Sequence, residues 1–151
     1  MKAVVAGVDA LSNSLLYGFN ALGLLSSAPC RPFDAQRAGI SLGEAAGFAL
    51  LQRLDDAPSA LRLRGWGEAN DAHHMSSPHP DGLGAERALT DALARAGVSA
   101  REIDYVNLHG TATPSNDAAE DLAVQAVFGP DVACNSTKGA TGHCLGASGA
   151  I

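Results

Sequence analysis

Two histidines and a lysine in the last third of the sequence are the residues most suited to chemistry. His109 follows a short apolar run, and Lys138 and His143 lie in a second stretch rich in glycine and hydroxyl groups. One histidine after a strand is more often structural than catalytic, but two histidines with a lysine, each flanked by glycine and hydroxyl residues, favour a functional site. The sequence therefore predicts that His109, Lys138 and His143 belong to one site.

The residues around these three suit hydrogen bonding to an elongated polar ligand. Hydroxyl and amide side chains crowd the stretch after His109, and Pro114 stiffens it. Glycines in the second stretch allow close backbone approach and unusual φ angles. Residues 145–151 also fit small-residue helix packing, and both interpretations stay open. The polar residues are Thr111, Thr113, Ser115 and Asn116, and the glycines are Gly139, Gly142, Gly146 and Gly149.

Two strands must deliver the three side chains. Residues 103–108 are β-branched, aromatic and apolar, so we predict a strand that ends at His109. We predict a helix capped by Asn116 or Asp117, with Glu120 in its first turn and Gly129-Pro130 at its end. Residues 132–135 form another expected strand, which leads to Lys138. Ligands of α/β proteins bind at strand ends, so the two strand ends should face one pocket.

The remaining elements look like scaffold. Residues 43–54 are ambiguous between helix and strand. Residues 26–39 hold two prolines and form a predicted loop, in which Arg31 and Asp34 could pair across a turn. The other expected elements are a strand at 2–8, a core helix from Ser12 or Asn13 through Leu25, a strand at 61–68, a loop at 70–82, and a helix at 83–96 with Gly97 as C-cap.

Composition excludes several classes of function. The chain has 151 residues, a net charge of −6 and only 5% aromatic residues, without a basic run, so nucleic acid and anionic membranes are disfavoured as partners. Its length fits one domain. No apolar segment is long enough for a membrane span, and no signal peptide is recognisable. Three cysteines without evident partners fit a reducing compartment, so we expect a cytoplasmic protein.

Metal and nucleotide sites are not supported by the spacing of the candidate residues. His73, His74 and His79 lack a cysteine or carboxylate at a familiar ligand spacing, so we interpret them as solvated loop residues and predict no metal. The glycine-rich residues 139–149 lack the Gly-Lys-Ser/Thr order of a phosphate loop.

Two motifs carry a close family resemblance. Asn-Leu-His-Gly-Thr-Ala-Thr-Pro-Ser-Asn-Asp (107–117) with Glu120, and Ser-Thr-Lys-Gly-Ala-Thr-Gly-His-Cys-Leu-Gly-Ala-Ser-Gly (136–149), resemble the histidine motifs of the β-ketoacyl-acyl carrier protein synthases. Residues 31–47, beginning Arg-Pro-Phe-Asp, and 71–78 are similar to further segments of that family. Two departures are Ala45, where the family usually has glycine, and Ser148, where it usually has alanine. The resemblance runs nearly end to end.

The resemblance implies an α/β thiolase-like fold, layered α-β-α-β-α, of which this chain covers only a part. Family members are much longer, so we expect the sequence to be a central excerpt. Residues 1–68 would end the N-terminal thiolase-like half, with 43–54 as a strand, and residues 69–151 would supply a loop, a helix and the start of the C-terminal half. Each sheet would then be incomplete.

The resemblance also implies a reaction. In the decarboxylative Claisen condensation of a 3-oxoacyl-acyl carrier protein synthase, malonyl on acyl carrier protein loses CO2 and its carbanion attacks an enzyme-bound acyl thioester. His109 and His143 would hold the malonyl thioester oxygen as charge develops there. Lys138 would orient His109, and Glu120 would be the partner of Lys138.

Further roles follow from the same resemblance. Thr111 and Thr113 would hydrogen-bond the phosphopantetheine arm of acyl carrier protein, and Asp117 would be a supporting residue. The resemblance implies no cofactor apart from the phosphopantetheine arm of the carrier protein. It also implies a role in fatty acid or polyketide-type biosynthesis. The expected partners are acyl carrier protein and a second copy of the parent enzyme.

The nucleophile of the family is a cysteine that we expect upstream of this sequence. Cys30, Cys134 and Cys144 match no family nucleophile, and we interpret all three as small buried residues, including Cys144 beside His143. The chain alone should therefore be inactive. Two other hypotheses remain open: a non-catalytic partner subunit that shapes chain length, and a carrier-binding fragment without activity.

Overall fold

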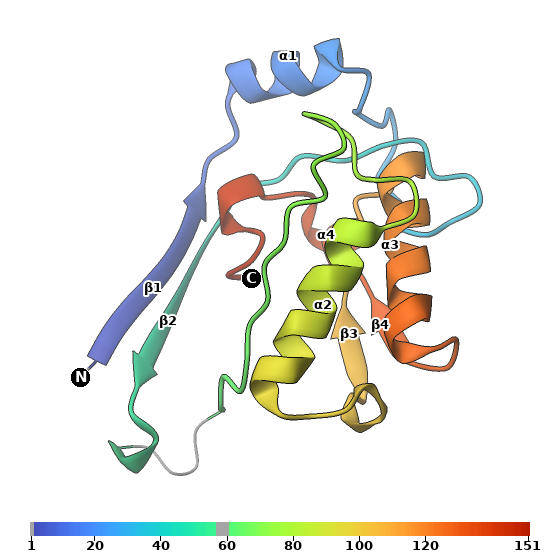
Figure 1. Cartoon of the computed structure of the whole chain (residues 1–151). Helices are drawn as coiled ribbons and strands as arrows, with labels where there is room; N and C mark the ends of the chain where they lie inside the picture. Colours follow the sequence, from blue (N-terminus) through green and yellow to red (C-terminus); the bar gives the residue numbers. More distant parts are fainter. Residues whose placement is uncertain (1, 57–60) are drawn as a thin grey trace.

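Two pairs of strands frame the structure, a computed structural model that describes residues 2–56 and 61–151. β1 (Lys2–Asp9) pairs antiparallel with β2 (Ala45–Gln52). β3 (Tyr105–Asn107) pairs parallel with β4 (Ala133–Asn135) (Figure 1). The strands predicted near these four positions are confirmed. Because β3 and β4 run the same way, their carboxyl ends lie side by side.

The helices are of unequal length; α2 and α3 lie beside β3 and β4, whereas α1 lies beyond the end of β1 (Figure 1). α2 matches the prediction, and it ends at Gly97 with the left-handed φ of 63° that suits a glycine C-cap. In the described part of the chain, the α-helices are α1 (Asn13–Ala21), α2 (Leu83–Ala96), α3 (Pro114–Phe128) and α4 (Lys138–Thr141), and the 3-10 turns are η1 (Leu54–Asp56), η2 (Ala100–Glu102) and η3 (Leu145–Ala147).

α1 begins as predicted but does not form a core. Ser12 caps it by accepting a hydrogen bond from the Leu15 backbone N–H at 3.3 Å. The helix ends at Ala21, four residues before the predicted end, and Gly23 then takes a left-handed φ of 67° that turns the chain away. None of its residues is buried, so the prediction of a core helix is wrong for this chain.

Residues 61–68 do not form the predicted strand. They run beside α2 without joining either sheet (Figure 1), and Gly65 and Gly67 lie so close to α2 that a side chain there would strike its backbone. A helix has no free backbone groups along its side, so this extended segment finds no ladder to join. Trp66 stacks against Arg95 of α2, with the guanidinium 5.0 Å from the ring centroid.

α3 begins three to four residues earlier than predicted, so Glu120 lies in its second turn rather than in its first. Thr113 is its N-cap and Pro114 its first residue, so the prediction that Asn116 or Asp117 caps the helix is wrong. Proline suits the first helical position because its missing N–H would have no helical partner there. Asp117 lies inside the first turn, where its carboxylate is free to bind elsewhere.

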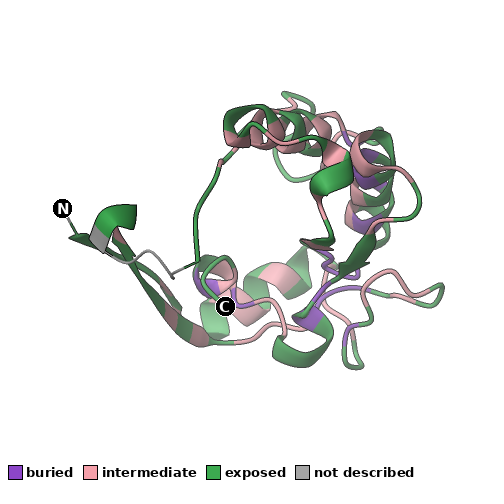
Figure 2. Cartoon of the chain, turned by 90° about the horizontal axis from the view of Figure 1, so that it is seen from below, coloured by how far each residue is buried: buried purple, intermediate pink, exposed green. Residues whose placement is uncertain are grey.

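The buried residues gather between α3 and the loops that follow β3 and β4 (Figure 2). Small side chains let these elements approach closely; a side chain on Gly82, before α2, would strike the backbone of α3 at Ala119. The buried apolar residues are Cys30, Ile40, Leu108, Ala112, Ala119, Ala123, Val124, Cys144 and Ala147. This core lies directly behind the candidate site.

A pair of glycines seats the C-terminal turn on the β1–β2 ladder. Gly7 and Gly47 face each other across the ladder, and a Cβ on either would lie 2.8 Å from the Cβ of Ala150. Beside them, the Gly146 N–H donates to the Asp9 carboxylate at 3.0 Å. The glycines therefore allow the turn after His143 to lie flat on the sheet.

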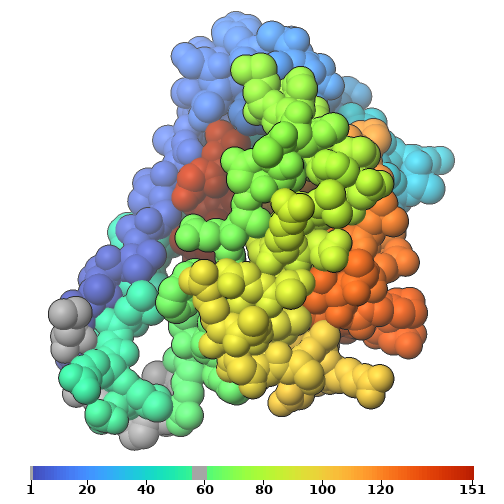
Figure 3. Space-filling view, viewed as in Figure 1, coloured from blue at the N-terminus to red at the C-terminus, as the bar shows by residue number. Residues whose placement is uncertain are grey.

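The opposite face of the same ladder is apolar and open. Val4, Val8, Phe48 and Leu50 share that face, since they alternate with Gly7 and Gly47, and each is 58–69% exposed. Figure 3 shows β1 along one flank of the molecule, away from α2 and α3. An apolar face of this kind is typical of a surface that another element covers.

We expect the isolated 151-residue chain to self-associate, because this face and the open strand edges favour pairing with another copy. Size-exclusion chromatography with light scattering measures the mass. Phe48→Glu should shift the chain toward monomer, whereas Tyr17→Glu, on an exposed residue of α1, should not. A compact wild-type monomer that melts cooperatively would contradict this expectation.

Candidate active site

The carboxylate of Glu120 holds the backbone at the end of β3. Its two oxygens accept hydrogen bonds from the His109 N–H at 2.6 Å and the Gly110 N–H at 2.7 Å. Within the described residues, the Lys138 ammonium has no carboxylate within 4.0 Å, so the prediction that Glu120 pairs with Lys138 is wrong. Each Glu120 oxygen is instead taken by a backbone donor, and Glu120 thereby sets the position of His109.

Ser136 joins the two motifs. Its buried hydroxyl donates to the Gly110 carbonyl at 2.8 Å and accepts a hydrogen bond from the Lys138 N–H at 3.3 Å. Gly110 has a φ of 40°, and a side chain there would strike Ser136, so only glycine fits. Sequence reasoning saw Ser136 only as a polar residue after a strand. Its link to Gly110 spans 26 residues and has no local signal.

The buried carboxylate of Asp117 holds the loop that follows β3, in line with its predicted supporting role. It is 1% exposed, and its carboxylate accepts hydrogen bonds from the Phe33 N–H at 2.7 Å and the Ala112 N–H at 3.1 Å. Phe33 and Ala112 both have left-handed φ angles, of 60° and 65°. Such backbone costs about 1–3 kcal/mol per residue, and hydrogen bonds to a buried carboxylate help to offset it.

Arg37 forms an ion pair with Asp117, and the sequence did not predict this pair. Its buried Nε lies 3.7 Å from the Asp117 carboxylate, and its other nitrogens donate to the carbonyls of Asp34 at 3.0 Å and Pro114 at 3.3 Å. Arg31, which we predicted to pair with Asp34, donates instead to the Gln36 carbonyl at 3.4 Å. The loop before β2 is thereby fastened to the start of α3.

Thr111 and Thr113 lie beside the histidines. Their hydroxyl oxygens are 2.9 Å apart, and both residues are buried. They line a cavity of about 190 Å³ together with His109, His143 and Asn116. The structure therefore brings both predicted binding residues to the predicted catalytic histidines.

His143 is held by its backbone and by its ring. Its N–H donates to the Ser41 carbonyl at 2.7 Å, and its carbonyl accepts from the Gly43 N–H at 3.1 Å, so the chain before β2 fixes its position. The backbone N–H of Leu145 lies 3.1 Å from ring Nδ1. A backbone N–H can only donate, so Nδ1 is an acceptor and the ring hydrogen of the neutral imidazole lies on Nε2.

The two imidazoles meet edge to face, with ring centroids 5.2 Å apart. Burial lowers the pKa of His143 to about 4, and positive charge on His109 and Lys138 adds to the shift. Burial also lowers the pKa of His109, next to the charge of Lys138, while Glu120 and Asp117 oppose the change. At neutral pH the His143 imidazole is therefore a neutral hydrogen-bond donor.

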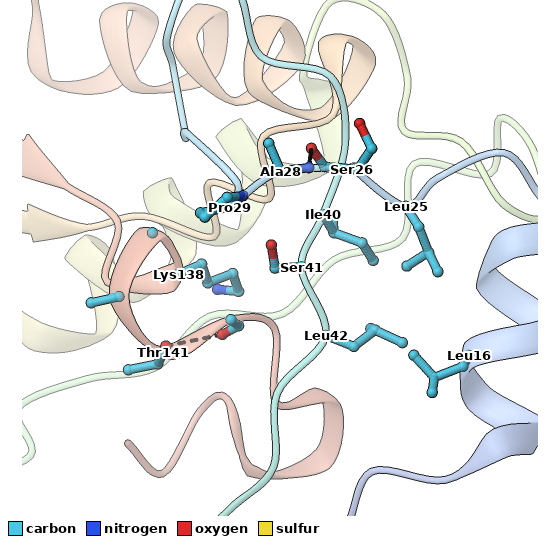
Figure 4. Close-up of a pocket in the computed structure, with 14 residues that line it drawn as sticks. Leu16, Leu25, Ser26, Ala28, Pro29, Ile40, Ser41, Leu42, Lys138 and Thr141 are labelled. Atoms are coloured by element: carbon cyan, nitrogen blue, oxygen red, sulfur yellow. Dashed lines mark hydrogen bonds between the residues drawn. The ribbon is translucent and has the colours of Figure 1, made fainter.

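Lys138 is buried at the start of α4 and lines two cavities. One, of about 500 Å³, has apolar walls from Leu16, Leu25 and Leu42, and Lys138 enters it opposite Ser41 (Figure 4). Burial lowers the pKa of Lys138, and the negative charge of Glu120 opposes this. The ammonium thus lies in a partly apolar setting without a direct ion-pair partner among the described residues.

The second cavity confirms that both strand ends face one pocket. It measures about 470 Å³ and is lined by Asn107 at the end of β3, by Leu108 and His109 after it, and by Thr137 and Lys138 after β4. Ser148 and the residues after it complete the wall. His109 and Lys138, from the two strand ends, therefore line one common space.

Burial was predicted for all three cysteines, and the structure confirms it for two of them. Cys30 and Cys144 are 4% and 1% exposed, and their thiols face the carbonyls of Lys138 at 3.0 Å and Thr141 at 3.5 Å. Cys134 is exposed, so its predicted burial is wrong. It lies on β4, whose residues are all exposed because the sheet has only two strands among the described residues.

Two other features bear on cofactors and membranes. In residues 2–56 and 61–151, His, Cys, Asp and Glu side chains do not gather in groups of three that could hold a metal ion, and the rings of His73 and His79 lie 4.9 Å apart. Over the same residues, every helix is too short or too polar to span a bilayer.

Glu120→Gln should loosen the backbone at His109. The amide keeps one acceptor oxygen but presents an NH2 group to the second N–H, and the loss of a hydrogen bond to a charged group costs about 1.5–3 kcal/mol. We expect amide hydrogen exchange at His109 and Gly110 to quicken roughly tenfold or more. Asp121→Asn, on the next residue of α3, should leave these two amides unchanged; equal exchange in both variants would contradict the role of Glu120.

Lys138→Met should raise the pKa of both histidines, because it removes a positive charge that disfavours a second one nearby. The neutral fraction of each imidazole would then decrease at mildly acidic pH. Histidine ring signals followed by NMR over pH give both pKa values. Arg101→Met, which removes an exposed cation on η2, should change neither; unchanged or lowered pKa values in Lys138→Met would refute the assignment.

Comparison with known protein families matches both parts of the chain. A family profile described as "Beta-ketoacyl synthase, N-terminal domain" matches residues 1–57, and one described as "Beta-ketoacyl synthase, C-terminal domain" matches residues 61–151. The two profiles together cover nearly the whole sequence.

Curated relatives carry names of the same kind. The chain is 41% identical to a mitochondrial 3-oxoacyl-[acyl-carrier-protein] synthase of Arabidopsis thaliana, over 97% of this chain and 35% of the relative. It is 35% identical to 3-oxoacyl-[acyl-carrier-protein] synthase 2 of Staphylococcus aureus, over 98% of this chain and 40% of the relative. The chain therefore spans between a third and two fifths of their length.

Solved structures resemble the chain in three dimensions. A ketosynthase (ApeO) from Xenorhabdus doucetiae, solved with its chain length factor (ApeC), is 46% identical with a TM-score of 0.90, covering 99% of this chain and 37% of that chain. A beta-ketoacyl synthase from Burkholderia phymatum is 33% identical with a TM-score of 0.91, covering 99% and 39%. The fold is thus part of the thiolase-like ketosynthase fold, and the chain belongs to the β-ketoacyl synthase family.

Proposed function

We propose that this chain is the histidine-bearing part of a 3-oxoacyl-acyl carrier protein synthase, an acyltransferase. The observation that carries the proposal is the edge-to-face pair of His109 and His143, with Lys138 beside them at the ends of two parallel strands. Residues 1–68 would end the N-terminal half of the enzyme, and residues 69–151 would begin the C-terminal half. We call the longer chain in which they would lie the full-length protein.

The reaction is a decarboxylative Claisen condensation. A cysteine outside these residues carries the acyl group as a thioester, since the thiols of Cys30 and Cys144 are buried against carbonyls and Cys134, on β4, does not line the cavities that hold the histidines. Malonyl on acyl carrier protein loses CO2, and the electron pair of the broken bond forms an enolate on the thioester. The enolate carbon attacks the acyl carbonyl, the cysteine thiolate leaves, and the 3-oxoacyl group stays on the carrier.

The histidines stabilise the enolate oxygen. Nε2–H of His143 donates to it, because Nδ1 is occupied as an acceptor by the Leu145 N–H. A low pKa keeps the imidazole neutral, so it binds the oxyanion without transferring a proton that would quench the carbanion. His109 lies at the right distance to supply a second donor to the same oxygen.

Lys138 and the two carboxylates prepare this arrangement. The charge of Lys138 lowers the pKa of both histidines and favours the enolate through the local field. Glu120 positions His109 by its backbone, and Asp117 positions the loop that carries the threonines. No step requires the side chains of these carboxylates to touch the substrate.

The partners follow from the substrate. Thr111 and Thr113 hydrogen-bond the amide groups of a phosphopantetheine arm that enters their cavity, so acyl carrier protein is the partner and no separate cofactor is needed. One solved relative, from a type II polyketide system, is described as a complex with its acyl-carrier protein. We also propose a homodimer of the full-length protein, located in the cytoplasm.

In the full-length protein, His143→Ala should abolish malonyl decarboxylation and leave acyl transfer to the cysteine intact. Removing one donor to a developing oxyanion typically lowers the rate by about 100- to 1,000-fold. Carbon dioxide release from malonyl carrier protein and acylation by labelled acyl carrier protein measure the two steps separately.

Loss of acyl transfer with decarboxylation intact would reverse the assignment of His143. A wild-type protein that binds acyl carrier protein but releases no carbon dioxide would instead identify a non-catalytic partner subunit. The 151-residue chain alone serves as the control without a nucleophile and should form no condensation product.

A further inference from the structure

Ser148 lies beside the ring of His143, where the resemblance places an alanine in most members of the family. Its hydroxyl oxygen is 3.1 Å from Nδ1 of His143. Both residues are half-buried, and Ser148 also lines the cavity that holds His109 and Lys138. The proposed reaction assigns no task to this hydroxyl.

The direction of this hydrogen bond follows from the neighbouring backbone. The Leu145 N–H, also 3.1 Å from Nδ1, donates to that nitrogen, so Nδ1 carries no hydrogen. The Ser148 hydroxyl can rotate to suit its partner, and it therefore donates as well. Two donors then share one ring nitrogen and hold the ring hydrogen on Nε2, across the imidazole.

The fold builds this contact at a measurable conformational cost. Leu145 has a left-handed φ of 43°, a backbone conformation that is strained for a non-glycine residue. That backbone turn directs the Leu145 N–H toward His143, and the Ser148 N–H closes it on the Leu145 carbonyl at 3.0 Å. Close packing of Ala150 against Gly7 and Gly47 holds the turn after His143 in place.

We propose that Ser148 is a positioning residue for His143, whose hydroxyl is the second donor to Nδ1 and keeps the Nε2 hydrogen directed at the substrate oxygen. The inference rests on the proposed function for its catalytic consequence, but the contact itself does not. A donor on Nδ1 opposes protonation there, so it also keeps the imidazole neutral in mildly acidic conditions.

Ser148→Ala tests the inference in the full-length protein. Ring nitrogen spectra of ¹⁵N-histidine protein report the tautomer and the pKa of His143 directly. We expect the pKa of His143 to rise and the Nδ1 signal to shift, with Nε2–H still the main tautomer because Leu145 remains. The kcat for malonyl decarboxylation should decrease roughly 3- to 10-fold, the range for one hydrogen bond, with little change in KM.

Two control variants make the outcome of Ser148→Ala decisive. Ser148→Thr keeps the hydroxyl and should restore the pKa and the rate, and Ser14→Ala, on exposed α1, should change neither. A Ser148→Ala protein with an unchanged His143 pKa and Nδ1 signal would overturn the inference, whatever its rate, and so would a threonine variant that behaves like alanine. A shifted pKa in a protein whose wild type releases no carbon dioxide would retain the role of Ser148 and refute the proposed function.

Discussion

The paired hydrogen bonds from the His109 and Gly110 N–H groups to the Glu120 carboxylate are the constraint on which the site depends. They fix the chain where β3 ends. A carboxylate with two backbone donors is a strong anchor because each bond is charge-assisted. α3 supplies a second carboxylate one turn earlier, so one helix sets the course of the loop from His109 to Thr113.

The second motif is held differently. His143 is attached to the chain before β2 through the Ser41 carbonyl and the Gly43 N–H, and the turn after it rests on the glycine pair of the β1–β2 ladder. The two histidines are therefore anchored to different sheets. Their ring contact of 5.2 Å depends on how the two family domains pack, and Ser136 is one direct link between the loops.

The electrostatics of the site favour neutral imidazoles. Burial and the charge of Lys138 lower the pKa of both histidines. The carboxylates of Glu120 and Asp117 accept hydrogen bonds from backbone N–H groups rather than from an imidazolium. The family resemblance implied that Glu120 pairs with Lys138, but in the structure its two oxygens accept from the His109 and Gly110 backbone. In the observed arrangement Glu120 holds the backbone, whereas the charge of Lys138 lowers the pKa of the histidines.

The sequence by itself determined the local features: the strands before His109 and Lys138, the ends of α2, and the gathering of two histidines and a lysine, because periodicity, glycine and motif spacing act over short stretches. It could not determine what depends on distant partners. Residues 61–68 alternate like a strand but lie against a helix, and Arg37 rather than Arg31 reaches a carboxylate 80 residues away. Only the tertiary structure decides that Glu120 accepts from the His109 backbone, or that Ser148 faces Nδ1 of His143, since these contacts depend on the path of the loop after β3 and of the turn after His143.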